Sequence, residues 1–129
     1  MTLQEITEFC SRWLPCWTGN QPEKLLAFYT KDAFYSDPTA KQGLKGQEQM
    51  LAYFKKLLRY NPDWRWTQEE VMPTEKGFTL KWRAEIPVGE KTIVEYGLDI
   101  VEMHNGLISR NEVYFDTLAL VSAIKALKG

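Results

Sequence analysis

Two aspartates stand where a folded chain could use a carboxyl group for chemistry. Asp37 directly follows the short aromatic segment FYS and directly precedes Pro38, which must end a strand. Asp99 lies within a predicted strand, in the segment GLDIV. A carboxylic acid in an apolar cavity resists ionisation, whereas a better solvated carboxylate stays ionised. Each residue also has a structural interpretation: Asp37 could cap a turn through its side chain, and Asp99 could be exposed or bond to Asn111.

The placement of the Asp99 side chain depends on one turn. If residues 105–106 form a two-residue hairpin loop, Asp99 pairs with Glu112 and lies on a charged, solvated surface. If His104 joins them in a three-residue loop, Asp99 pairs with Asn111 and lies in an apolar wall. A register step of one residue moves a strand's side chains to the other face of the sheet. The residues alone leave both alternatives open.

Several further residues are candidates for the lining of a pocket beside these acids. The aromatic ones could contact an apolar ligand or fill the core. The predicted ligand-contacting residues are Trp13, Trp17, Tyr35, Tyr53, Trp66, Asn111 and Val113. In the strand that contains Trp82, alternation ordinarily places Trp82 against the core and Arg83 and Glu85 on the opposite face. Arg83 is predicted to face Glu95 across two strands as a structural ion pair.

The elements that must position these residues follow from the hydrophobic pattern. Spacing of three and four predicts a helix over 3–17, started by a capping box of Thr2 and Glu5 and loosened near its end by Pro15. Pro22 suits the first position of a helix that reaches about residue 29. The remaining predicted elements are a strand over 32–38, a helix over 46–60, strands over 64–72, 77–86, 92–103 and 107–116, and a helix over 118–128. Helices followed by an antiparallel meander predict an α+β fold in which a curved sheet wraps around the helices.

Composition limits the classes of function. The 129 residues suit one domain, 1–129. A net charge of −1 without a basic run predicts no basic surface that could bind nucleic acid. No apolar stretch is long enough to span a membrane, and the amino terminus carries acid where a signal peptide carries base, so we expect a cytoplasmic protein. Cys10 and Cys16 lie on different faces of one predicted helix, which predicts two buried thiols without a disulfide. No Cys or His spacing indicates a metal site.

The order of motifs resembles the SnoaL-like branch of the nuclear transport factor 2 superfamily, over about residues 5–120. The resemblance rests on three segments, WLPCWTGNQPEKLLAFYTKDAFYSDP at 13–38, LKGQEQMLAYFKKLL at 44–58 and GLISRNEVYFD at 106–116. The resemblance implies a cone-shaped α+β barrel with a deep pocket at its open end, and a homodimer formed through the outer face of the sheet. It also favours the register that turns Asp99 inward.

The resemblance further implies chemistry without a cofactor or metal. Asp37 falls on the general base of ketosteroid isomerases, and Asp99 falls on their pocket acid and on the acid/base aspartate of SnoaL-type polyketide cyclases. On that pattern Asp37 abstracts a proton next to a carbonyl and Asp99 hydrogen bonds to the enolate oxygen. Trp13 replaces the isomerase tyrosine, which argues against ketosteroid isomerisation itself. Resemblance to the related epoxide hydrolases would turn Arg83 and Glu85 inward instead of Trp82, but Val113 replaces a carboxylate that those enzymes require. The sequence also lacks the His residues that a scytalone dehydratase would use, since His104, the one histidine, lies in a turn.

Three functions remain open at this point. The first is an isomerase or cyclase that acts on a hydrophobic carbonyl compound through Asp37 and Asp99. The second is a protein that binds a small apolar ligand without chemistry in the same pocket. The third is a dimerisation module whose pocket is filled by side chains such as Trp13 and Trp66.

Overall fold

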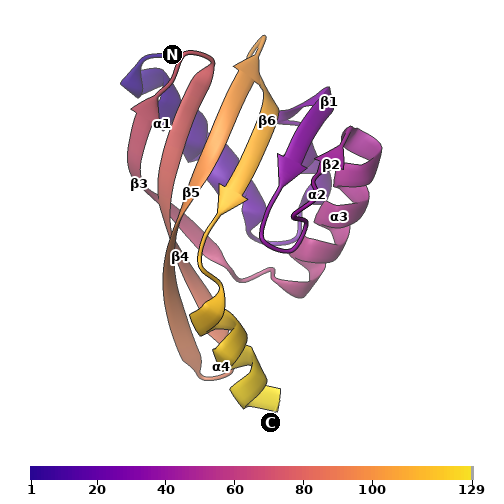
Figure 1. The fold of residues 1–129 in the computed structure, drawn as a ribbon, viewed down its shortest axis with the longest axis vertical. Helices are drawn as coiled ribbons and strands as arrows, with labels where there is room; N and C mark the ends of the chain where they lie inside the picture. Colours follow the sequence, from indigo (N-terminus) through magenta and orange to yellow (C-terminus); the bar gives the residue numbers. More distant parts are fainter. Residues whose placement is uncertain (129) are drawn as a thin grey trace.

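The computed structural model describes residues 1–128, which form a helical layer on one curved sheet (Figure 1). The helices are α1 (Leu3–Trp13), the 3₁₀ helix η1 (Leu14–Trp17), α2 (Pro22–Leu26), α3 (Gln47–Tyr60) and α4 (Leu118–Lys128). The strands are β1 (Tyr29–Ser36), β2 (Leu44–Lys45), β3 (Arg65–Pro73), β4 (Gly77–Val88), β5 (Lys91–His104) and β6 (Leu107–Tyr114). The predicted helices and strands are present with shifted ends, and β2 is the strand that the sequence pattern missed.

The first helix begins and ends as its local sequence dictates. The Thr2 hydroxyl accepts a hydrogen bond from the Glu5 amide, and the Glu5 carboxylate accepts one from the Thr2 amide, so the predicted capping box is confirmed. The α-helix ends at Trp13 instead of residue 17, because Pro15 lacks the amide proton that the next turn needs, and the chain continues as η1. Cys10 is buried as predicted, whereas Cys16 is only partly buried; both are free thiols.

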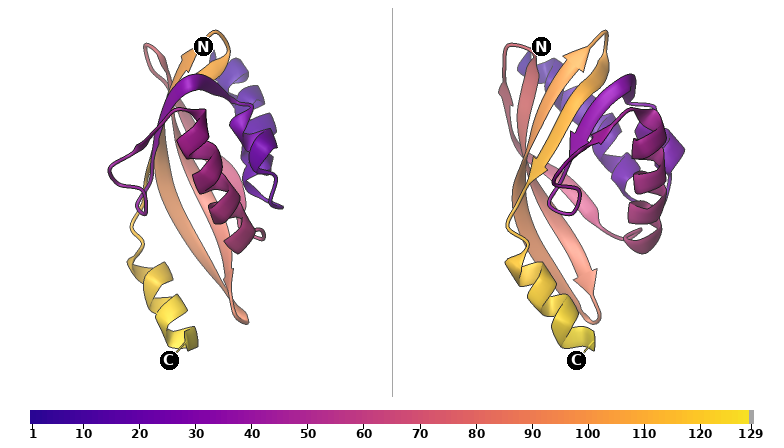
Figure 2. Two further views of the ribbon diagram at one scale, coloured as in Figure 1. Left: turned by 90° about the vertical axis from the view of Figure 1, so that its right-hand side faces the viewer. Right: turned by 45° about the vertical axis from the view of Figure 1, so that its right-hand side comes forward.

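The six strands form one open, mixed sheet in the order β2-β1-β6-β5-β4-β3. The predicted cone-shaped α+β fold is confirmed with two differences: the sheet is not closed into a barrel, and β1 runs parallel to β6. Figure 2 shows α1, α2 and α3 together on one face of this sheet, while α4 lies beside the far end of the β4–β5 hairpin. The helices and the inner face of the sheet therefore enclose the core.

The hairpin between β5 and β6 has the shorter of the two predicted loops. His104 pairs with Leu107, which leaves a two-residue loop of Asn105 and Gly106. Both loop residues have positive φ, 51° and 82°, as a type I′ turn requires. Taken alone, this turn would place Asp99 on the outer, charged face.

A β-bulge three residues beyond the turn reverses that outcome. Met103 pairs with Ile108, but Glu102 pairs with Arg110, so Ser109 is an extra residue in β6. The Ser109 hydroxyl donates a hydrogen bond of 3.1 Å to the Glu102 carbonyl. Past the bulge, Asp99 pairs with Val113 on the inner face, a partner that neither predicted register gave it. The inward placement of Asp99 is thus confirmed, although the physical cause is the bulge and not a three-residue loop.

The two faces of β4 separate as ordinary alternation predicts. Trp82 points inward and is 2% exposed, whereas Arg83 lies on the outer face, where it forms an ion pair with Glu85 at 3.5 Å. The prediction that Arg83 faces Glu95 is wrong, since Arg83 pairs with Tyr96 in the register of β4 and β5. The inner face of β4 therefore belongs to the core, and the charged pair does not approach it.

The outer face of the sheet carries a row of exposed apolar side chains. Val94, Tyr96 and Leu98 alternate along β5 and are 42%, 51% and 43% exposed, and Tyr114 of β6, which pairs with Leu98, is 53% exposed. The helices α1, α2 and α3 lie together on the other face of the sheet (Figure 2). No helix of the described chain has the length and apolar character that a membrane crossing requires.

Candidate active site

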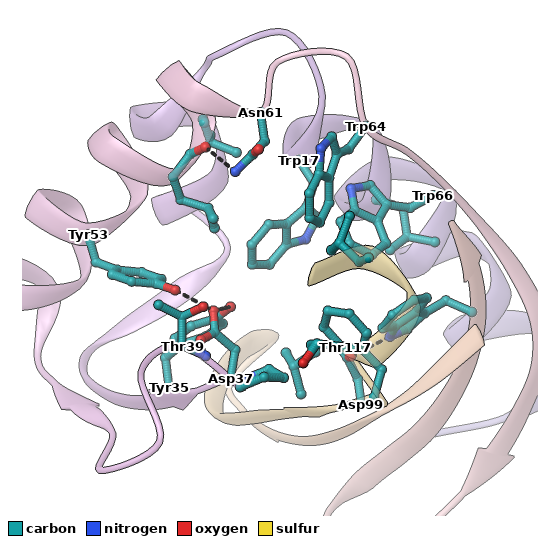
Figure 3. Close-up of a pocket in the computed structure, with 18 of the residues that line it drawn as sticks. Trp17, Tyr35, Asp37, Thr39, Tyr53, Asn61, Trp64, Trp66, Asp99 and Thr117 are labelled. Atoms are coloured by element: carbon teal, nitrogen blue, oxygen red, sulfur yellow. Dashed lines mark hydrogen bonds between the residues drawn. The ribbon is translucent and has the colours of Figure 1, made fainter. Parts of the chain in front are cut away.

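A pocket of about 410 Å³ opens between the inner face of the sheet, the end of α3 and the start of α4. Figure 3 shows its open space between Trp17, Trp64 and Trp66 on one side and Asp37, Thr117 and Asp99 on the other. Its lining is mostly aromatic and aliphatic, which suits an apolar small molecule. The apolar lining residues are Leu14, Trp17, Tyr35, Pro38, Tyr53, Leu57, Leu58, Trp64, Trp66, Trp82, Val113, Phe115, Leu120, Val121 and Ile124.

Most of the residues predicted from the sequence meet in this pocket. Seven of the nine candidates line it: Asp37, Asp99, Trp17, Tyr35, Tyr53, Trp66 and Val113. Two do not. Trp13 is fully buried in the core, and Asn111 lies behind Asp99, with no exposed surface. Placing Trp13 at the ligand was therefore wrong, because α1 turns this side chain toward Phe9 and Trp17.

Asp37 is held at the rim by four hydrogen bonds. Its Oδ1 accepts the backbone N–H groups of Thr39 and Ala40 at 2.9 and 2.7 Å, which is the turn cap expected of an aspartate before proline. Its Oδ2 accepts the hydroxyl groups of Tyr35 and Tyr53 at 2.8 and 2.7 Å. An ionised carboxylate offers about four acceptor positions, so this network uses all of them.

Asp99 occupies the opposite kind of environment. Its side chain lies in the apolar wall of β5, and the residue is only 4% exposed. Oδ1 accepts the indole N–H of Trp82 at 2.7 Å and Oδ2 accepts the amide of Asn111 at 3.1 Å, so each oxygen keeps a free acceptor position. Burial raises the pKa of Asp99 from 3.8 to about 7, against the opposing effect of these two hydrogen bonds. Near neutral pH this group can therefore both hold and release a proton.

A second layer of polar groups supports Asp99 from inside the core. The buried Tyr29 hydroxyl donates to Asn111 Oδ1 at 2.9 Å, and the other end of the same amide donates to Asp99. These two hydrogen bonds fix the orientation of the Asn111 amide and, through it, the orientation of the Asp99 carboxyl group. Asn111 thus acts as a positioning residue, and its predicted hydrogen bond to Asp99 is confirmed.

Trp82 reaches Asp99 because β5 has a glycine opposite it. Gly97 pairs with Trp82 in the sheet, and a Cβ at residue 97 would lie 2.2 Å from Cζ2 of the indole. Because Gly97 has no side chain, the indole of Trp82 can lie across β5 and donate its N–H to the carboxylate of Asp99. A close ring approach, and not an unusual backbone angle, is therefore what requires glycine here.

The aromatic rings around the pocket stand at steep angles to one another. Trp66 and Trp82 meet at 87° with ring centres 4.9 Å apart, and Trp82 and Phe115 meet at 71° and 5.2 Å. Trp17 and Trp66 meet at 62° and 6.4 Å. The rings therefore present themselves to the cavity from several directions instead of stacking into a single wall. The indole nitrogen of Trp66 is buried and has no hydrogen-bond partner.

Several lining residues were not predicted from the sequence. Trp64 and Phe115 lie at strand ends, where the pattern gave no indication of a cavity. Leu120, Val121 and Ile124 come from α4, whose apolar face was read only as helix periodicity. The spacing of Trp64 and Trp66 at i and i+2 placed both rings on one face of β3, and this was the available signal. Among residues 1–128 no cluster of three or more Cys, His, Asp or Glu side chains is arranged to hold a metal ion.

The chain matches the model of a known family. Residues 10–111 match the model of a SnoaL-like domain, which is more than half of the chain and includes both Asp37 and Asp99. No curated protein matches the chain.

Comparison with solved structures gives many neighbours of the same fold at low identity. A candidate SnoaL-like polyketide cyclase from Jannaschia sp. CCS1 has a TM-score of 0.78 and 18% identity, covering 95% of this chain and 93% of its own. A protein with a ketosteroid isomerase-like fold from Catenulispora acidiphila, in complex with trimethylamine, has a TM-score of 0.77, 15% identity and 92% coverage of both chains. A protein from Mycobacterium tuberculosis has a TM-score of 0.74 and 20% identity, covering 90% and 94%. At these identities the likeness shows the fold alone.

Proposed function

The chain belongs to the SnoaL-like domain family, and we propose that it is a small-molecule enzyme that moves a proton on an apolar carbonyl compound bound in the pocket. The observation that carries this proposal is Asp99, an almost fully buried carboxyl group in the wall of a mainly aromatic cavity. Burial raises the pKa of Asp99 to about 7. A general acid or base works best when its pKa lies near the working pH.

The two aspartates have different tasks in this proposal. Asp37 accepts four hydrogen bonds and has no acceptor position left for a substrate proton. Asp99 accepts two and keeps one free position on each oxygen. The proton therefore moves through Asp99, while Asp37 supplies a fixed negative charge at the rim. This assignment replaces the expectation that Asp37 is the base.

The reaction follows from that assignment. Ionised Asp99 takes a proton from the carbon next to the substrate carbonyl: the C–H bond breaks, an O–H bond forms on Asp99, and the electron pair moves onto the carbonyl oxygen as an enolate. Return of the proton to a different carbon gives an isomer. Attack of the enolate carbon on a second carbonyl of the same molecule gives a ring. Neither route requires a redox partner, because no electrons leave the substrate.

Ligand binding without chemistry is the second candidate. The pocket is large enough for a small molecule, and its apolar lining supports such a role without any use of Asp99. The similar protein from Catenulispora acidiphila, which is in complex with trimethylamine, adds support for ligand binding on this fold. A pocket that only binds would keep its affinity in an Asp99→Asn variant and would show no turnover with any carbonyl compound.

Hydrogen exchange on a simple ketone tests the enzyme proposal. We expect the protein in D₂O to exchange the benzylic hydrogens of phenylacetone, followed by ¹H NMR, at a rate that rises with pH and levels off above an apparent pKa of about 7. Asp99→Asn should lower the rate by about 10² or more, since it removes the proton acceptor. Asp32→Asn, which changes an exposed carboxylate of β1, is the matched control and should keep the full rate. Full activity of Asp99→Asn, or an Asp99 carboxyl that titrates near 4 by ¹³C NMR, would rule the proposal out.

A further inference from the structure

We propose that the ligand of this pocket carries a tertiary or quaternary ammonium group joined to its apolar part. This inference names the substrate class of the proposed enzyme and rests on the pocket being its site of action. Three properties of the lining carry it: its charge, the state of its hydrogen-bond donors and the arrangement of its rings.

The charge of the lining has one sign. Asp37 and Asp99 both line the pocket, and among the described residues no Lys, Arg or His side chain does. Lys41 lines a separate hollow of about 280 Å³ that also borders Asp37, but no ion pair in residues 1–128 joins it to that carboxylate. An anionic ligand would therefore meet only repulsion, whereas a cation would balance a charge that the cavity leaves unpaired.

The donors beside the two aspartates are already in use. The hydroxyl groups of Tyr35 and Tyr53 both donate to Asp37, and the indole N–H of Trp82 donates to Asp99. The indole nitrogen of Trp66 is buried away from the surface of the cavity. The donors next to the two carboxylates thus point at the aspartates and not into the cavity. The lining also holds the hydroxyl group of Thr117 and the indoles of Trp17 and Trp64, so the committed donors are those beside the carboxylates.

The rings complete a site for an alkylated cation. Trp17, Trp64, Trp66 and Trp82 line the pocket together with Phe115, and their steep mutual angles surround the space from several sides. Tryptophan faces attract ammonium groups more strongly than other aromatic rings do, and the attraction grows when water is excluded. Alkyl groups on nitrogen also gain from contact with the apolar walls. A cage of this kind favours a cation that is itself partly apolar.

The number of free acceptors decides between kinds of ammonium. A primary ammonium has three N–H donors that need partners, but Asp37 is fully occupied and Asp99 offers one free position on each oxygen. A tertiary ammonium has a single N–H, which Asp99 can accept, and a quaternary ammonium has none. Asp99 alone would leave one N–H of a primary ammonium unpaired, which is costly when the group is buried, whereas alkyl groups on nitrogen contact the apolar walls. The site therefore selects the more alkylated ions.

A positive charge on the substrate also fits the proposed proton transfer. Removal of the proton creates an enolate in a cavity whose lining, among the described residues, holds no Lys, Arg or His side chain to balance the new negative charge. An ammonium group on the same molecule would offset this charge from within the substrate. The lining thus gives a physical reason why a cationic substrate would react here and a neutral one of the same shape would react more slowly.

Binding of two isosteric ketones to the wild-type protein tests the inference. Phenacyltrimethylammonium and 3,3-dimethyl-1-phenylbutan-1-one differ in one central atom, nitrogen or carbon, and the anion 4-oxo-4-phenylbutanoate serves as the third probe. Titration calorimetry and quenching of tryptophan fluorescence report the affinities. We expect the cation to bind at least tenfold more tightly than its carbon isostere and the anion to show no binding at millimolar concentration. Equal or tighter binding of the carbon isostere, or no binding of either ketone, would overturn the inference.

Two variants assign the preference to the named residues. Trp64→Leu should lower the ratio of cation to neutral affinity at least threefold, because it removes a ring and keeps an apolar side chain. Asp99→Asn should lower the same ratio by removing a charge. Tyr60→Leu, which alters an exposed ring on α3 outside the pocket, should leave the ratio unchanged. A ratio that none of these changes affects would show that the cation binds elsewhere.

The binding assay and the exchange assay fail independently. A preference for the cation without hydrogen exchange on phenylacetone would keep the ligand class and reject the proton transfer. Exchange that depends on Asp99 without any preference for the cation would keep the enzyme and reject the ligand class.

Discussion

Gly97→Ala is the perturbation that should expose how the Asp99 site is built. A methyl group at residue 97 would lie 2.2 Å from Cζ2 and 2.6 Å from Cη2 of Trp82, whereas real Cβ contacts essentially never fall below 3.0 Å. Since carbon atoms pack at about 3.5–4.0 Å, the indole must move by roughly 1 Å or more. Its N–H now lies 2.7 Å from Asp99 Oδ1, so a movement of that size breaks the hydrogen bond.

The expected result has a sign that separates it from an ordinary glycine substitution. In the middle of a strand, alanine is normally more favourable than glycine by about 0.5–1 kcal/mol. Here overpacking against Trp82 should lower the free energy of unfolding by about 1–3 kcal/mol. The pKa of Asp99 should rise further, because the hydrogen bond from Trp82 is one of the two that hold it down.

Urea denaturation and ¹³C NMR titration measure the two effects, and a double-mutant cycle tests their cause. Phe at residue 82 lacks the part of the indole that meets the new methyl group, so Gly97→Ala should cost much less in a Trp82→Phe background. The same loss of stability in both backgrounds would refute the proposed clash. So would a stable Gly97→Ala protein in which the pKa of Asp99 is unchanged.

Two further predictions concern pH and assembly. The pKa of Asp99 is higher in the folded chain, about 7, than its ordinary 3.8, so its contribution to stability is complete below 3.8 and is lost as the pH rises through 7. Unfolding free energy should therefore fall by about 2–3 kcal/mol between pH 5 and 7.5, and this fall should vanish in Asp99→Asn but persist in Asp32→Asn, as urea denaturation would show. We also propose that the exposed row on β5 and β6 is the interface of a homodimer. Analytical ultracentrifugation of the wild-type protein should give a mass of twice 15.0 kDa. Leu98→Glu should give the monomer, whereas Tyr60→Glu should leave the dimer intact. A wild-type monomer at tens of micromolar would contradict the dimer.

The candidate site was predictable where local sequence carries it. Asp37 caps its turn, as an aspartate before a proline commonly does. It accepts a hydrogen bond from Tyr35 because the two residues lie at i and i+2 of one segment. Asp99 was identified as a candidate, but its surroundings were not. Trp13 was misplaced because helix periodicity identifies a buried face without saying whether that face meets a cavity or other side chains.

The different roles that we propose for Asp37 and Asp99 could not be predicted from their residue type. Both are single aspartates flanked by uncharged residues in the sequence. Their different occupancy by donors depends on partners far along the chain, such as Tyr53 for Asp37 and Trp82 for Asp99. Contacts of this kind arise only when separate elements pack together.

The sequence by itself determined the order of the main elements and the α+β class, because periodicity, caps and turn residues act within a few positions of one another. The tertiary structure decided which face Asp99 takes, through the extra residue Ser109 in β6, and it brought α4 to the pocket. Both outcomes depend on contacts between segments that are distant in the sequence. In the case of Asp99, a shift of one residue in strand pairing exchanges the two faces of the strand. Local propensities are insensitive to such a shift, whereas burial of the whole inner face depends on it.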